Sequence, residues 1–316
     1  MLRKIIPATI AMIAIFYIYL SLKKTTDADN EIVVSIKPLH SLVCSLTKGI
    51  AAPVLLLDGY VSPHHAQLQP SQVQLIKNAK TFIWIGPAYE QPLTKHVKAL
   101  KNNALTIQNN SSIKLKPLRN GAFWDKHTCC HDHAHEDHHH QHETSLDGHI
   151  WLSPLMMMQI VDLVVHHLKT VYPKHHEVLD KNANDYKVRL QLLHQQLLQK
   201  MLPYKGSAYI IQHDGNQYFD AVYGVQTIAT ISIDPSVPAS AGHILKIRKA
   251  IKKGVIRPRC LYAERQMDAA LAKSYATSFK ISFAVVDYLG VDIQAGETAY
   301  EELMNAYVDA FILGLK

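Results

Sequence analysis

Three histidines of this 316-residue chain, which holds 20 in all, stand beside short apolar segments where metal ligands commonly lie. His64 and His213 follow apolar runs, His149 directly precedes one, and Asp287 follows another. Ligands of parallel α/β sheets gather at the carboxyl ends of the strands. Three imidazoles and one carboxylate form a complete tetrahedral set for Zn²⁺. Each histidine alone is more often an ordinary loop residue, but together they predict one metal site.

The apolar runs that carry these residues alternate with segments of helical spacing. This alternation predicts an α/β fold with parallel sheets covered by helices. The expected strands are 31–36, 54–57, 81–85, 208–211, 227–231, 261–263 and 283–286. The expected helices are 39–48, 70–77, 154–202 (interrupted at Pro173), 244–252, 267–279 and 300–315.

A long helix divides the expected elements into two groups. Residues 174–202 carry one continuous apolar stripe, and a helix of that length extends roughly 40 Å at 1.5 Å per residue. The stripe consists of Leu179, Ala183, Tyr186, Leu190, Leu193, Leu197 and Met201. We therefore expect an N-terminal α/β lobe (31–172), a stiff linking helix and a C-terminal α/β lobe (206–316).

Residues 127–143 are a dense run of histidines, acids and two cysteines with almost nothing apolar. Such a run cannot bury a core, so we expect a mobile loop that binds several metal ions weakly. Its histidines are His127, His131, His133, His135, His138, His139, His140 and His142. Cys129 and Cys130 lie among them, which favours metal binding or reversible oxidation over a structural disulfide.

The first residues, 1–24, begin with positive charges, continue with an apolar run and end with two lysines. This layout is typical of an export signal. The apolar run is at the short edge of what a membrane span requires, so the segment is either a cleaved signal or a retained membrane anchor. Both interpretations place the body of the protein outside the cytoplasm, in the periplasm or an equivalent compartment, where it is tethered if the segment is retained.

The formal net charge is +7, yet the lysines and arginines are scattered and no basic stripe is interleaved with aromatic residues. This pattern argues against nucleic acid as a partner. Acidification below about pH 6.5 should protonate the histidines and release bound metal.

Four separated segments of the chain resemble the zinc-uptake ABC-transporter substrate-binding proteins. They are DGYVSPHHAQLQPSQVQLIKNAKTFIWIGPAYE from Asp58, DGHIWLSP, IIQHDGNQYF and VDYLGVDIQAGETAYEELM. The resemblance runs from about Ile32 to the C-terminus and implies two lobes, a rigid linking helix and one metal site in the cleft. It also implies a monomer that carries zinc as transported ligand to a membrane permease driven by an ATPase.

By this resemblance His64, His149 and His213 would be the ligands, with Asp287 as fourth ligand or charge partner. The imidazole of His213 stands where manganese and iron relatives carry a carboxylate, which favours zinc. Pro63 replaces an acid that some members have before the first ligand, so a water is the alternative to Asp287. His65 remains an alternative to His64. Many zinc members have a disulfide in the C-terminal lobe, but Cys260 has no evident partner and is expected to be free.

Two other functions deserve comparison with zinc capture. His133 to His138 fits the HxHxDH pattern of metallo-β-lactamase-type hydrolases, but no apolar strand precedes it, and the chain contains no HExxH or GxSxG motif. We therefore do not expect an enzyme. A surface metal-binding adhesin is the second alternative, since relatives of this type have been given that role.

Overall fold

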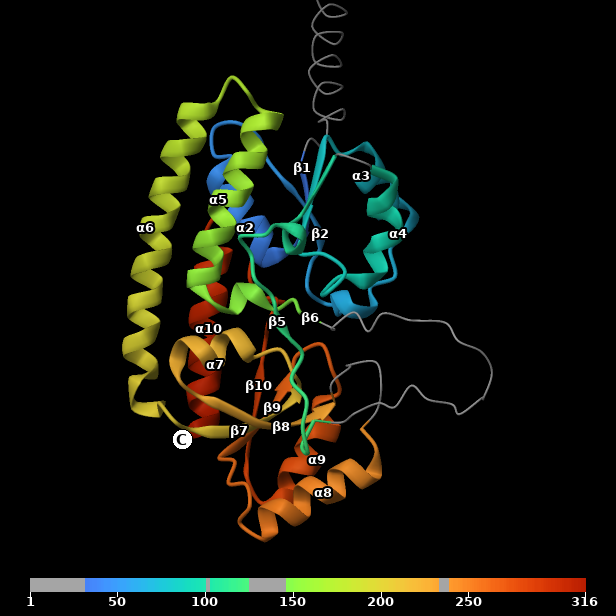
Figure 1. Ribbon diagram of the computed structural model, residues 1–316, viewed down its shortest axis with the longest axis vertical. Coiled ribbons are helices and arrows are strands. Elements are labelled where there is room, and N and C mark those ends of the chain that lie inside the picture. The colour runs from blue at the N-terminus through green and yellow to red at the C-terminus, as the bar shows by residue number, and fades with distance from the viewer. Residues whose placement is uncertain (1–31, 101–102, 125–145, 233–238) are drawn as a thin grey trace, which may run out of the picture.

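The computed structural model describes residues 32–100, 103–124, 146–232 and 239–316, which form two lobes arranged end to end (Figure 1). The predicted two-lobed α/β fold is confirmed. The N-terminal segment 1–24 lies outside the described residues. Among the helices that are described, none has the length and apolar character needed to cross a membrane.

The N-terminal lobe contains a parallel four-stranded sheet in the order β2-β1-β3-β4. Its strands are β1 (Ile32–Ile36), β2 (Val54–Leu57), β3 (Thr81–Trp84) and β4 (Ala104–Thr106). The connecting helices are α2 (Lys37–Leu46), α3 (Pro70–Asn78) and α4 (Thr94–Val97). Helices cover a parallel sheet on both faces, which explains why the fully buried β1 has a nearly unbroken apolar sequence.

The C-terminal lobe contains a second parallel sheet, in the order β10-β9-β7-β8. Its strands are β7 (Ala208–His213), β8 (Gln226–Ser232), β9 (Cys260–Glu264) and β10 (Ser282–Val286). Its helices are α7 (Gln217–Tyr223), α8 (Ala241–Lys252), α9 (Ala269–Phe279) and α10 (Ala299–Leu315). Counted from the first strand of each lobe, both sheets have the order 2-1-3-4, so the two lobes share one topology.

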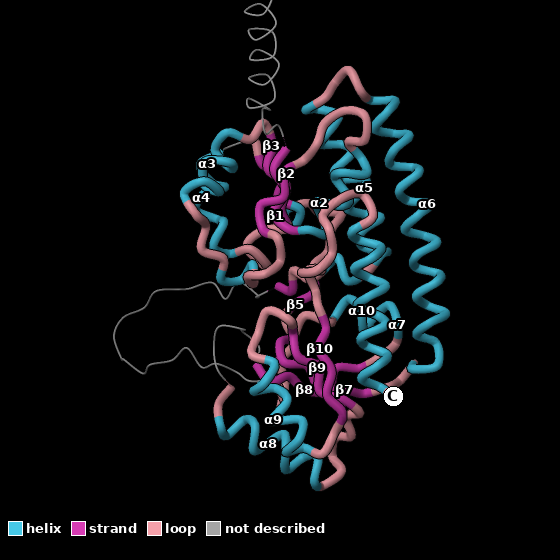
Figure 2. The backbone as a smooth tube through the Cα atoms, turned by 180° about the vertical axis from the view of Figure 1, so that it is seen from behind, coloured by secondary structure: helices cyan, strands magenta, loops and turns pink. Residues whose placement is uncertain are grey.

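Two long helices, α5 (Pro154–Val171) and α6 (His176–Met201), pack against each other beside the lobes. Figures 1 and 2 show α6 running alongside both lobes. All seven residues of its predicted apolar stripe are buried. Helix α10 returns from the C-terminal lobe and packs against α2 and α6, so the helical layer is continuous across the molecule.

A short antiparallel pair, β5 (Lys116–Pro117) with β6 (Leu146–Asp147), lies between the lobes (Figure 1). The segment after β5 continues onto the C-terminal lobe, where the amide of Thr230 in β8 donates to the carbonyl of Phe123 over 3.1 Å. Arg119 in this segment pairs with Asp214 and Asp220 of the same lobe. The chain therefore crosses between the lobes here as well as along α6.

Candidate metal centre

His64, His149 and His213 come together between the two lobes. One ligand atom from each lies within 4.8 Å of the others. The Nε2 atoms of His64 and His149 are 3.4 Å apart, and His213 lies with its ring centroid 5.0 Å from each of the other two rings. The lone pairs of neutral imidazoles repel one another at such distances, and a cation that accepts all three removes the repulsion.

His64 is presented by a single 3₁₀ turn, Pro63–His65, that follows β2. The fixed φ of Pro63 suits the first position of such a turn. His65 lies on the same turn but outside the converging group, so the structure brings His64, and not His65, to the other two histidines. The segment between β2 and this turn approaches the other lobe closely, because a Cβ atom on Gly59 would lie 3.1 Å from the Cβ of Leu289.

The other two histidines are each oriented by a buried carboxylate. Asp147 accepts both the backbone amide of His149 (2.9 Å) and its ring Nδ1 (2.8 Å). Glu264, the last residue of β9, lies 3.1 Å from Nδ1 of His213. A carboxylate at Nδ1 places the proton there and leaves Nε2 as the free ligand atom. Both rings are therefore set in the tautomer that binds a metal through Nε2.

The surroundings act on the pKa values of His64 and His213 in opposite directions. Burial, together with the neighbouring imidazoles His213 and His149, holds the pKa of His64 well below its usual range. Burial alone would also lower the pKa of His213, but the hydrogen bond and charge of Glu264 outweigh it and raise that pKa. His64 therefore presents a neutral imidazole at pH 7, whereas Glu264 favours the protonated form of His213.

Aromatic rings and glycines enclose the three imidazoles. Tyr89 contacts His64 and His149 edge to face, with centroid distances of 4.7 and 4.9 Å. Two glycines make room for this packing. A Cβ atom on Gly148 would lie 2.6 Å from the Cβ of Tyr89, and one on Gly215 would lie 3.0 Å from Nε2 of His149.

Asp287 follows β10 as expected, but the structure does not bring it into the group of ligand atoms. Its carboxylate accepts the backbone amides of Leu289 (2.9 Å), Gly290 (3.0 Å) and Val291 (2.6 Å). Both oxygens are engaged by this turn, and Gln266 donates a fourth hydrogen bond over 3.2 Å. Asp287 is thus held by its own turn and is not among the converging ligand atoms.

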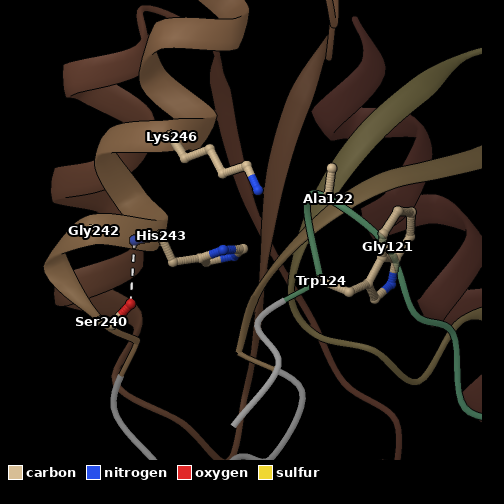
Figure 3. Close-up of a pocket in the computed structure, with 7 residues that line it drawn as sticks. All are labelled: Gly121, Ala122, Trp124, Ser240, Gly242, His243 and Lys246. Carbon is tan, nitrogen blue, oxygen red and sulfur yellow. Dashed lines mark hydrogen bonds between the residues drawn. The ribbon is translucent and has the colours of Figure 1, made fainter. Parts of the chain in front are cut away.

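A cavity of about 340 Å³ adjoins the three imidazoles and is lined also by His65, Gln91 and Leu118 among others. A larger cavity of about 590 Å³ lies at the start of α8, where His243 and Lys246 face Trp124 (Figure 3). It contains a single imidazole, whose Nε2 donates to the carbonyl of Thr230 over 2.7 Å. The larger cavity thus lacks a set of converging ligands, and we place the metal centre at the smaller one.

The histidine-rich run 127–143, with its eight histidines, Cys129 and Cys130, lies outside the described residues, and so its predicted weak binding stays a prediction. Cys260 is buried and free, as expected. Burial raises its pKa to about 12, so it does not supply a thiolate at neutral pH.

Three residues of the site were not predicted: Asp147, Glu264 and Tyr89. Asp147 stands two residues before His149, and Glu264 ends a strand that pairs with β7. The rule that found His213, a polar residue at the carboxyl end of a strand, applies equally to Glu264. Tyr89 also lies in a loop after a strand, but its sequence context gives no signal that distinguishes it from a core aromatic.

A family model described as the periplasmic component A of the zinc-uptake complex matches residues 32–312. The chain belongs to this zinc-uptake component A family. The resemblance found in its sequence segments is thereby confirmed. The family comprises solute-binding components of uptake systems.

Relatives in this family match along most of their length. The high-affinity zinc uptake system protein ZnuA of Brucella abortus is 28% identical over 301 residues, covering 87% of this chain and 88% of the relative. ZnuA of Yersinia pestis is 25% identical, covering 92% of each chain. Among solved structures, a crystal structure of ZnuA superposes with a TM-score of 0.72 at 19% identity, covering 90% of this chain and 98% of the other. The periplasmic zinc-binding protein TroA of Treponema pallidum has a TM-score of 0.70 at 16% identity, covering 90% and 98%. At these identities the two structures establish the fold.

Proposed function

We propose that this protein captures Zn²⁺ outside the cytoplasm with His64, His149 and His213 and delivers it to the permease of an ATP-driven zinc importer. The observation that carries the proposal is the convergence of three imidazoles between the lobes, two of them oriented by buried carboxylates. Imidazole nitrogen favours zinc over manganese, calcium and magnesium, which take oxygen ligands. The zinc-uptake names of the relatives support the same cargo.

In this proposal Asp287 is a charge partner of the bound ion, and a water molecule completes the tetrahedron. Three protein ligands with an open fourth position also occur in catalytic zinc sites. We propose binding without catalysis, because membership of a solute-binding family supports transport. An assay of zinc-dependent hydrolysis of a generic ester and a β-lactam separates the two functions, since a binding protein turns over neither substrate.

We further propose that segment 127–143 collects zinc weakly, that segment 1–24 directs export or tethers the protein, and that the protein acts as a monomer. These proposals rest on the sequence. The tight site and the weak sites differ in their ligands, so they are separable by deletion.

Isothermal titration with Zn²⁺ tests the assignment of the tight site. Replacing His64, His149 and His213 together by alanine should abolish the tightest binding event. Deleting residues 127–143 should leave that event unchanged and remove only weak ones. Loss of the tight event in the deletion variant, with its retention in the triple variant, would overturn the proposal.

A further inference from the structure

Lys37, the first residue of α2, is a buried lysine that reaches from the N-terminal lobe into the C-terminal lobe. Only 4% of its surface is exposed. Its ammonium group donates to the carbonyls of Gly290, Ile293 (2.7 Å) and Val291 (3.3 Å). An ammonium has three N–H donors, and here all three are directed at the turn that follows Asp287.

The same turn also holds the Asp287 carboxylate, through its N–H groups rather than its carbonyls. The amides of residues 289–291 converge on the two carboxylate oxygens. Gly290 has a φ of +65°, which is the left-handed conformation that directs successive N–H groups toward one point. The carboxylate therefore occupies an anion-binding turn made by its own chain.

One peptide group connects the two charges. The carbonyl of Gly290 accepts from Lys37, and the N–H of the same peptide unit, that of Val291, donates to Asp287 over 2.6 Å. Hydrogen bonds in such a series polarise one another, so each end strengthens the hold of the other. The ammonium of one lobe and the carboxylate of the other thus form an ion pair mediated by a backbone amide.

We propose that Lys37 determines metal specificity by holding Asp287, through the Gly290–Val291 peptide, out of the coordination sphere of the transported ion. Asp287 lies in a segment that borders the site. Its neighbour Tyr288 packs against His149 with a centroid distance of 5.5 Å. Asp287 also follows the strand residue that pairs with Glu264, the partner of His213. Withholding it leaves three imidazoles as the protein ligands.

The ligand set that results selects against hard cations. Mn²⁺ prefers carboxylate oxygen, whereas Zn²⁺ accepts an all-imidazole set with one water. This inference rests on the proposed function, since it assigns the three histidines to the transported ion. It adds a residue that touches neither the ion nor its ligands but decides whether an oxygen joins them.

The test compares Lys37→Met, Asp287→Asn and the double variant with the unchanged protein. Lys37→Met should raise Mn²⁺ affinity about tenfold. It should also shift the visible absorption spectrum of bound Co²⁺ toward that of a site with a higher coordination number. The double variant should lose both effects, because the released carboxylate is gone. Lys48→Met is the matched control, since Lys48 also bridges the lobes, to Glu297 over 2.9 Å, at an exposed position away from the Asp287 turn.

Equal Mn²⁺ affinity and an identical Co²⁺ spectrum in folded Lys37→Met would overturn the inference. If that variant does not fold, Asp287→Asn decides alone. Zinc affinity within threefold of the original and an unchanged Co²⁺ spectrum support a withheld carboxylate, whereas a loss of tenfold or more with an altered spectrum contradicts it. Failure of the proposed function is distinct, because tight zinc binding would then survive replacement of the three histidines.

Discussion

The two lobes share one strand order but place opposite charges at the ends of corresponding strands. The first strand of the N-terminal lobe, β1, is followed at once by Lys37, whereas the first strand of the C-terminal lobe, β7, ends in His213 and is followed by Asp214. The third strand of the C-terminal lobe adds Glu264. At this pair of first strands the common scaffold thus places a cation in one lobe, and a histidine with carboxylates beside it in the other.

This difference shows how a duplicated topology becomes an asymmetric site. The N-terminal lobe contributes His64 on a short turn, and no carboxylate partner for its ring is found in the described part of the chain. The C-terminal lobe contributes His213 with Glu264 behind it. His64 is thus held by a local turn, and His213 by a hydrogen bond to a buried carboxylate.

The largest effect on the free energy of unfolding is expected at the ion pairs that Arg119, from the N-terminal half of the chain, makes with the C-terminal lobe. Arg119 pairs with Asp214, whose side chain is only 1% exposed, and with Asp220. Arg119→Met leaves that buried carboxylate without its cation and should lower the free energy of unfolding by about 3 kcal/mol. Urea denaturation measures this, with Arg119→Lys as control, which keeps the charge and should lose less. Equal stability of Arg119→Met and the original protein would show that these ion pairs do not stabilise the fold.

A smaller effect is expected from the carboxylates behind the imidazoles. Glu264→Gln and Asp147→Asn should each weaken zinc binding about 10- to 100-fold, because each removes the charge that orients and polarises one ring. Competition with a chromogenic chelator measures the affinity. Asp309→Asn, at an exposed acid paired with Lys200 on the linking helix, should leave it unchanged. A loss in only one of the two variants would show that the lobes do not contribute equally.

The pH dependence of stability should differ in sign between His64 and His213 in metal-free protein. The lowered pKa of His64 means that the unfolded chain takes up a proton below about pH 6.5 that the folded protein excludes, so stability falls on acidification. The raised pKa of His213 stabilises the fold at low pH, and this contribution is lost as pH rises through the folded pKa. Each of the two histidines contributes at most about 1.4 kcal/mol per pH unit to the slope of the free energy of unfolding against pH.

Urea unfolding with EDTA at pH 5, 6 and 7 tests these signs. His64→Gln should make the loss of stability between pH 7 and 5 shallower, and His213→Gln should make it steeper. Slopes that change in the same direction in both variants would contradict the opposite environments of the two rings.

The smallest effect is expected at the exposed bridge between Lys48 and Glu297. Lys48→Met should change the free energy of unfolding by less than about 1 kcal/mol, since solvent screens the pair. A thermal melt at low and at 0.5 M salt measures it, with Lys181→Met as a control within α6 alone. A larger loss that disappears in salt would indicate that this bridge contributes substantially to holding the lobes together.

Much of the fold follows from apolar periodicity, because the runs that form β1, β3 and β7 are continuous and the stripe of α6 keeps its spacing over 26 residues. Some of the short elements were not predicted. Helix α7 has seven residues and β4 only three. Residues 116–124 belong to the N-terminal half by sequence, yet their contacts with β8 and Asp214 lie in the other lobe, and no local pattern carries that information.

The candidate site also has parts that could be predicted from the sequence and parts that could not. His64 and His213 could be grouped because strand ends in parallel sheets lie together, whereas His149 follows the short antiparallel strand β6 and was grouped with them because it precedes an apolar run. The position of Asp287 after a strand suggested a ligand, but the direction of its carboxylate depends on three amides of the following turn. Such backbone convergence depends on φ angles and cannot be inferred from residue types.

Gly215 has a consequence for how this protein can vary. A single methyl group at this position would lie 3.0 Å from both Nε2 of His149 and a ring carbon of Tyr288. The smallest possible side chain would therefore crowd the nitrogen of His149 that is proposed to bind zinc, while leaving every donor atom chemically intact. A residue with no side chain thus restricts mutational drift at this centre, in addition to the imidazoles.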